Sequence, residues 1–166
     1  MVEHYTKALV LDKEDLGDLD SRVYLYCKGI GKVSAKVKSA RKITSKLAGH
    51  LEPGNFVDIR LIELGGFQAV DALSAGSLPR APRTMTALRL IREMTADRDF
   101  DPELWEMIEK QELATGALLT CLGFSPQLAR CGFCQQGDPS HFLIRDLEYS
   151  CHPCLLKAGR PLHFVL

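Results

Sequence analysis

The chain has 166 residues, of which 46% are hydrophobic and 25% are charged, and 21 Lys and Arg balance 21 Asp and Glu. This composition is typical of one or two small globular domains, and it excludes a disordered, collagen-like or low-complexity chain. No run of 18 apolar residues exists, and residues 1–5 have neither the basic cluster nor the apolar stretch of a secretion signal. We therefore expect a cytoplasmic protein.

The charge is unevenly placed along the chain. Between Ser21 and His50 there are eight basic residues and no acidic one. The rest of the chain carries 13 basic and 21 acidic residues, so the neutral total hides an electrostatic dipole. A charged run usually marks a solvated face, but a basic run is also how a protein attracts nucleic acid. The candidate DNA-binding residues are Arg22, Lys28, Lys32, Lys36, Lys38, Arg41, Lys42 and Lys46.

The pattern inside this run favours the nucleic-acid interpretation. Residues 32–38 alternate with period two, which places three lysines on one face of a strand and Val33, Ala35 and Val37 on the other. Such a strand buries one face and presents ammonium groups that can follow a phosphate backbone. Nearby aromatic residues, Tyr24, Tyr26 or Phe56, are candidates for a base-stacking platform, although such residues are more often part of the core of a barrel.

The first 75 residues predict five short strands separated by turns. The strands are expected at 5–11, 22–27, 32–38, 56–64 and 67–73. Five short strands favour a small closed barrel, because closure removes exposed edges. An OB-fold barrel in residues 1–76 is the leading expectation, and an SH3-like barrel or an open sheet fits the same pattern.

Beyond a linker at 77–83 that contains two prolines, the apolar period becomes helical. Ala87, Leu90, Ile91 and Met94 share one helix face, and Asp101 followed by proline is a typical helix start. Further apolar spacing ends before Gly123. We expect an α+β multidomain chain, with a small helical domain at 84–166 that packs as a scaffold and contains a cysteine knuckle at 131–154.

Four of the six cysteines form two Cys-x2-Cys pairs separated by 16 residues. Two such pairs can surround one metal ion with four thiolates, which is typical of structural zinc. Two disulfides are the alternative, but the leftover cysteines and the absence of an export signal disfavour them. We expect one structural zinc per chain, with rubredoxin-like iron as the alternative metal. The predicted ligands are Cys131, Cys134, Cys151 and Cys154.

No sequence feature predicts an enzyme. Four protein ligands leave no open metal position, and the chain has no nucleophile paired with a base and no phosphate-binding glycine loop. His141 and His152 lie near the knuckle and are expected to be bystanders, and Cys27 and Cys121 are expected to be core residues. The acidic residues between Asp12 and Asp20 are interpreted as a solvated turn rather than a magnesium site.

The order of basic barrel, short helical region and four-cysteine knuckle resembles the RecO family of bacterial recombination mediators. Its specific parts are the opening at 5–11, the basic stretch at 31–42, the Leu-Glu-Pro-Gly turn at 51–54 and the run at 118–131 that ends at the first knuckle. The resemblance covers nearly the whole chain. Ser39 stands where the family usually has glycine, and family members typically have a longer helical domain after the knuckle.

The resemblance implies an OB-fold that binds single- and double-stranded DNA, anneals complementary strands and cooperates with RecR to help load the recombinase. It also implies contact with the tail of single-stranded DNA-binding protein and work at the nucleoid. We expect a non-enzymatic protein of recombinational DNA repair, and the alternative is a zinc-knuckle interaction adaptor without strong DNA binding. By matching position, the family's DNA contacts fall on Lys32, Lys36, Lys38, Arg41 and Lys42, and its metal ligands on the four knuckle cysteines.

Overall fold

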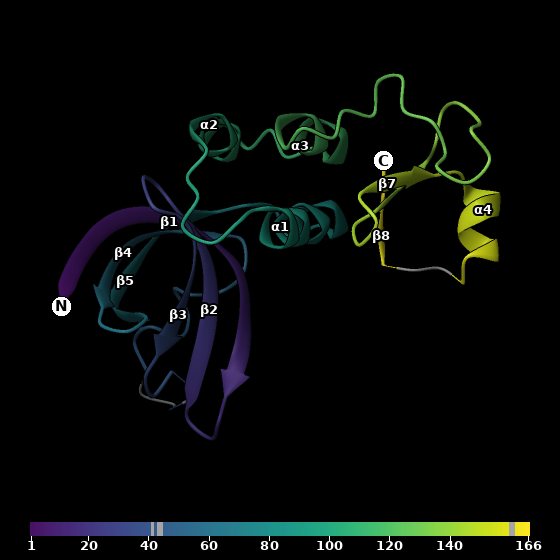
Figure 1. Cartoon of the computed structure of the whole chain (residues 1–166). Helices are drawn as coiled ribbons and strands as arrows, with labels where there is room; N and C mark the ends of the chain where they lie inside the picture. Colours follow the sequence, from purple (N-terminus) through teal and green to yellow (C-terminus); the bar gives the residue numbers. More distant parts are fainter. Residues whose placement is uncertain (41, 43–44, 160–161) are drawn as a thin grey trace.

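The N-terminal half is a closed barrel in a computed structural model that describes all residues except 41, 43–44 and 160–161 (Figure 1). The strands close in the order β1-β2-β3-β5-β4, with β3 parallel to β5 and the other pairs antiparallel. This confirms the OB-fold and excludes the SH3-like barrel and the open sheet. The strands are β1 (Val2–Leu16), β2 (Asp20–Cys27), β3 (Gly31–Val37), β4 (Asn55–Glu63) and β5 (Phe67–Ser77).

Strand β1 is covered on both faces, which explains why it is longer and more apolar than an alternating strand. Ala8 and Val10 lie in the barrel interior, whereas Leu9 and Leu11 pack in the cluster that the helices form against the barrel. All four are buried. Because successive side chains of a strand point to opposite faces, four buried residues in a row require a layer on each side.

Three helices follow the barrel: α1 (Pro82–Met94), α2 (Pro102–Lys110) and α3 (Thr115–Cys121). Asp101 caps α2, since its carboxylate accepts the backbone N–H groups of Glu103 and Leu104 at 2.8 and 3.3 Å. The helix ends at Gln111, whose φ of 59° is left-handed. The apolar spacing between residues 101 and 122 therefore belongs to two helices rather than one.

The connection between α1 and α2 runs beside the start of β3. The backbone N–H of Arg98 donates to the carbonyl of Lys32 at 2.8 Å. At Gly31, with φ of 85°, a Cβ atom would lie 2.2 Å from the carbonyl oxygen of Asp99. Only glycine fits this approach, so the barrel and the helical layer meet here by direct backbone contact.

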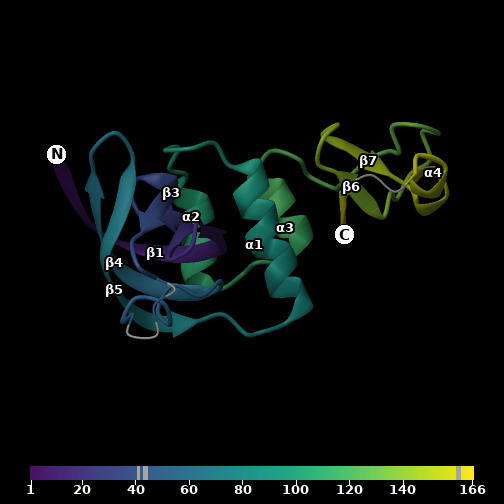
Figure 2. The same cartoon turned by 90° about the horizontal axis from the view of Figure 1, so that it is seen from below.

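The C-terminal part consists of three short strands, which form one sheet, and a short helix. In chain order these are β6 (His141–Leu143), β7 (Glu148–Ser150), α4 (His152–Lys157) and β8 (His163–Val165). The sheet order is β7-β6-β8. Phe142 and Phe164 join the cluster that also holds the helices. Figures 1 and 2 show the barrel and this sheet at opposite ends of the molecule, with α1 between them.

The predicted linker at 77–83 includes the last residue of β5, Ser77, and the start of α1, Pro82. The division into domains at 1–76 and 84–166 stays a prediction. Among the described residues, no helix has both the length and the apolar character needed to cross a membrane.

Candidate functional site

The basic run divides into two groups at opposite ends of β3. At the end of β3, Lys36 lies directly opposite Arg22 in the β2–β3 ladder, and Lys38 follows the strand. The side chains of Lys36 and Arg22 are 45% and 43% exposed. In Figure 1 this end of the barrel, with the β1–β2 turn, points away from α2. We call Arg22, Lys36 and Lys38 the basic end of the barrel. Lys42 and Lys46 are exposed in the connection from β3 to β4, and Arg41 lies outside the described residues.

Acidic side chains of β1 and β2 pair with the basic end. The Asp20 carboxylate lies 2.7 Å from Lys36 Nζ and accepts the backbone N–H of Ser39 at 2.9 Å. The hydrogen bond from Lys36, followed by that from Ser39, lowers the pKa of Asp20. Glu14 lies 3.6 Å from the Arg22 guanidinium. Since exposed ion pairs contribute only about 0.2–1 kcal/mol, phosphates can compete for these cations.

At the other end of β3, Lys32 is engaged inside the protein. Its ammonium group donates to the carbonyls of Arg92 and Thr95 at 2.8 and 2.5 Å, and it lies 3.4 Å from Asp97. The Lys32 side chain is only 15% exposed. A cation at the last carbonyls of a helix satisfies their hydrogen bonds and the helix dipole. Lys32 therefore joins the barrel to the end of α1.

Lys28 is also near the helical layer. Its ammonium group lies 3.3 Å from the Glu109 carboxylate of α2. The strand alternation thus puts Lys32 and Lys36 on one face, but the helices cover only the first of them. Lys28 and Lys32 are therefore at the other end of β3 from Arg22, Lys36 and Lys38.

The three aromatic residues considered for base stacking are not exposed platforms. Tyr26 is fully buried, its hydroxyl accepts the Asp101 N–H at 2.9 Å, and its ring lies 6.4 Å from that of Trp105. Tyr24 is half-buried, with the Arg92 guanidinium carbon 3.8 Å from its ring centroid. Phe56 packs against the helical cluster. All three serve the contact between barrel and helices.

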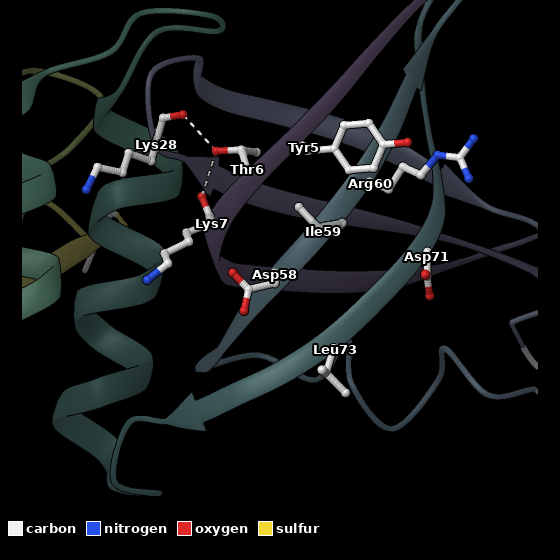
Figure 3. A pocket seen from close by; sticks show the side chains of 9 residues that line it. All are labelled: Tyr5, Thr6, Lys7, Lys28, Asp58, Ile59, Arg60, Asp71 and Leu73. Carbon is white, nitrogen blue, oxygen red and sulfur yellow. Dashed lines mark hydrogen bonds between the residues drawn. The ribbon is translucent and has the colours of Figure 1, made fainter.

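One exposed aromatic residue on the barrel, Tyr5, was not predicted. It lines a hollow of about 650 Å³ on the outer face of β1, β4 and β5, where Figure 3 shows its ring beside Arg60. Tyr5 is 72% exposed, and the Arg60 guanidinium forms an ion pair with the Glu3 carboxylate at 3.0 Å. Asp58 and Asp71 line the same hollow. The mixture of acids and bases makes this face a poor phosphate-binding surface.

The four knuckle cysteines come together as the spacing predicts. Their sulfur atoms all lie within 4.8 Å of one another, and the sulfurs of Cys134 and Cys151 are 3.7 Å apart. Four sulfurs at about 2.3 Å from a tetrahedral ion lie roughly 3.8 Å apart, so this group fits a metal. A disulfide needs about 2.05 Å between sulfurs, and all four thiols are free. Among the described residues, this is the only group of potential ligands that is close enough to share an ion.

The two knuckles are built by local hydrogen bonds. In the first, the Gln135 N–H donates to the Cys131 carbonyl at 2.8 Å, and the Gly132 N–H donates to the Tyr149 carbonyl of β7 at 2.9 Å. In the second, Cys151 occupies the N-cap position of α4, its carbonyl accepts the Leu155 N–H at 3.0 Å, and Cys154 lies in the first turn of the helix. A turn next to a strand and the start of a helix thus present the four sulfurs to one point.

The cysteines differ in their readiness to ionise. Burial opposes ionisation of Cys131, but backbone N–H groups of Cys151, Cys134 and Phe133 outweigh it and lower the pKa to about 6. The Cys154 pKa is raised to about 12, first by its hydrogen bond to Cys151. The lowered pKa of Cys131 favours the thiolate form that binds a metal cation.

The remaining cysteines and the nearby histidines are not part of this group. Cys27 is fully buried, as expected, and burial raises its pKa to about 12. Cys121 is half-buried, and burial raises its pKa to about 11. The His141 ring lies 5.4 Å from that of His152 and 5.1 Å from that of His163. Burial, followed by these two imidazoles, lowers the pKa of His141.

Comparison with known proteins finds relatives that are similar to most of this chain. Residues 1–75 match the family model of the N-terminal domain of recombination protein O. The DNA repair protein RecO of Myxococcus xanthus is 29% identical over 176 residues, covering 91% of this chain and 72% of that protein. RecO proteins of Bacillus velezensis and Bacillus subtilis are 27% and 25% identical, each covering 91% of this chain and 68% of its relative.

The chain is therefore similar to RecO proteins over most of its length, and its N-terminal part matches their N-terminal domain. This similarity supports a role in DNA repair or recombination, and it agrees with the closed OB-fold barrel. What sequence reasoning missed in this chain is the pairing of charges. Two signals could have placed acids at the basic end. Asp20 lies two residues before Arg22 and so on the same face of β2, and the register of the β1–β2 hairpin puts Glu14 opposite Arg22. No local signal links Lys32 to Thr95.

Proposed function

We propose that this chain binds single- and double-stranded DNA at the basic end of its barrel, anneals complementary strands and cooperates with RecR to help load the recombinase at the nucleoid of the cytoplasm. The observation that carries the proposal is the cluster of exposed cations on an OB-fold that is similar to the N-terminal domain of RecO proteins. OB-folds commonly hold nucleic acid along strands β2 and β3 and the adjoining loops. The proposed phosphate contacts are Arg22, Lys36, Lys38, Arg41, Lys42 and Lys46.

The mechanism needs no chemical step. Cations at the basic end neutralise phosphates of a bound strand and so reduce its repulsion toward a complementary strand. Asp20 and Glu14 hold Lys36 and Arg22 in place until a phosphate replaces the carboxylate as their partner. Lys28 and Lys32 are left out of the proposed contact set, because their partners belong to the helical layer.

We propose that the cysteine group holds one structural zinc ion. Four thiolate ligands leave no coordination position for water, so the ion would stabilise the knuckle rather than act on a substrate. Cys131, Cys134, Cys151 and Cys154 would hold it. The C-terminal part is then a rigid surface for protein partners, for which RecR and the tail of single-stranded DNA-binding protein are the proposed candidates.

The test compares two charge-reversal variants of the full chain. Lys36→Glu combined with Lys38→Glu removes two phosphate contacts, so the slope of log affinity against log salt for a single strand falls by about 1.4. Binding weakens alike for all sequences. Wild-type affinity falls roughly a hundredfold between 50 and 200 mM salt if about five phosphates are neutralised. Fluorescence anisotropy with labelled oligonucleotides measures both.

The matched control is Arg80→Glu combined with Lys110→Glu, two exposed residues away from the basic end. It carries the same change of charge and is expected to bind DNA as the wild type does. Equal losses in both variants, or an affinity that salt does not change, would contradict the proposal. Annealing of bare complementary oligonucleotides must also be faster with wild-type protein than without it.

The interaction adaptor is the second candidate function, and one observation favours it. Phe133 and Leu156, near the knuckle, are 55% and 43% exposed, so their apolar side chains are accessible to a protein partner. The adaptor predicts weak DNA binding by the whole chain together with binding of RecR. The anisotropy measurement above separates the two functions.

A further inference from the structure

A second basic hollow lies far from the barrel's basic end. It has a volume of about 380 Å³ and is formed by α1, the start of α3 and β8. Arg83 and Arg89 of α1, Thr115 of α3 and His163 of β8 line it, and no carboxylate does. None of these residues was a candidate from the sequence, because they come from three segments spread over 80 positions.

The two arginines differ from most cations of the molecule in their partners. Arg22, Lys36 and Arg60 each lie within 4 Å of a carboxylate. Arg83 and Arg89 are exposed and form no ion pair with the acids among the described residues. The hollow therefore carries positive charge that the protein itself does not neutralise.

One arginine has an aromatic neighbour in the hollow. The Arg89 guanidinium carbon lies 6.0 Å from the ring centroid of Phe164, and that ring is buried. At this distance the ring attracts the guanidinium by a cation–π contact, and the N–H groups stay available. Glu112 lines an adjoining hollow that shares Arg83 and Thr115, so its carboxylate would repel an anion bound nearby.

We propose that this hollow binds a phosphodiester group of a second nucleic-acid strand, an inference that rests on the proposed function. Guanidinium groups match phosphate oxygens with paired N–H donors, and a threonine hydroxyl is a common additional phosphate contact. A phosphate is favoured over a base because the lining offers two guanidinium groups and the hydroxyls of Thr86 and Thr115, and its phenyl ring, that of Phe164, is buried.

The position of the hollow gives it a role in annealing. In Figure 1, the β1–β2 turn lies at the end of the barrel that points away from α1, and β8 lies beyond α1. One strand at each place keeps two strands on one protein molecule without direct repulsion between them. Holding both strands raises their effective concentration for each other, which speeds pairing.

The experiment counts strands and measures annealing with the full chain. Arg83→Glu combined with Arg89→Glu is compared with the wild type and with Arg80→Glu, an exposed residue of the same segment that does not line the hollow. Native mass spectrometry with short non-complementary single strands at low salt is expected to find two strands on the wild type and on Arg80→Glu, and one on the double variant. The salt slope of the second binding step falls by about 1.4.

Annealing of complementary oligonucleotides is expected to slow in the double variant, while the first strand binds with wild-type affinity. Arg83→Lys combined with Arg89→Lys keeps the charge and tests folding: it is expected to retain two strands. Two strands on the Glu variant with an unchanged annealing rate would overturn the inference. Tight binding of a tetra-aspartate peptide that oligonucleotides do not displace would also overturn it, since the hollow would then be a carboxylate site.

The same data separate this inference from the function on which it rests. If Lys36→Glu with Lys38→Glu abolishes the first strand but the hollow variants change nothing, only the second site fails. If the wild type binds no DNA, both fail.

Discussion

The barrel and the cysteine module, residues 131–166, are stabilised by different interactions. The barrel interior is a continuous apolar cluster contributed by all five strands and the β3–β4 connection. In the module, β6, β7 and β8 have three residues each, and α4 has six. So small a sheet buries little apolar surface, and elements of this size usually need a metal or other cross-link. The module therefore depends on the four-cysteine group and on Phe142 and Phe164, which pack in the cluster of the helices.

The largest difference between the two regions is expected when the metal is removed. A structural zinc contributes about 10–16 kcal/mol of binding free energy in small zinc domains, so a strong chelator is expected to unfold the module while the barrel stays folded. Hydrogen exchange resolves the two regions, and elemental analysis is expected to give about one zinc per chain. Cys131→Ser has the same effect as chelation.

Cys121→Ser is the matched control, since that thiol lies outside the four-sulfur group. It is expected to keep both the metal and the protected module. A metal-free protein with two disulfides, or a module that stays protected from hydrogen exchange after chelation, would show that the metal does not stabilise the module.

A smaller effect is expected at the contact between barrel and helices. Lys32→Met leaves the last carbonyls of α1 without their ammonium donor, and we expect a loss of about 2 kcal/mol in the free energy of unfolding. DNA affinity is expected to be nearly unchanged. Denaturant unfolding and anisotropy measure the two quantities.

Lys36→Met is the control with the opposite expectation, because its ion pair with Asp20 is exposed. It is expected to change stability little and to weaken DNA binding. If Lys32→Met weakened DNA binding more than Lys36→Met, the assignment of the two lysines would be reversed.

The smallest effect is a pH dependence of the module. Burial and two neighbouring imidazoles lower the pKa of His141, so the folded module keeps this side chain neutral. Below the ordinary histidine pKa of about 6.5, the unfolded state takes up the proton first, and the stability that neutral His141 contributes is lost as pH falls. His141→Gln is expected to flatten this dependence in thermal unfolding. An identical pH profile for the variant would show that other groups dominate.

Much of the barrel could be predicted because strand signals are local. Alternation in residues 32–38 located β3, and the buried run at 8–11 located the centre of β1. Tyr26 was harder, because an aromatic residue on an alternating strand suits either a core or a binding face. Its burial follows from Trp105 and Phe100, which the chain brings onto it from more than 70 positions away.

Alternation, capping and Cys-x2-Cys spacing act over a few residues, so the five barrel strands, the start of α2 and the cysteine group could be predicted from the sequence. Which lysines face solvent depends on the tertiary structure. Lys32 and Lys36 share one strand face, yet Lys32 meets the end of α1, 63 positions away, and Lys36 meets Asp20 at the open end of the barrel. A charge finds its partner through space, so the basic run could be counted from the sequence but not divided into structural and exposed residues.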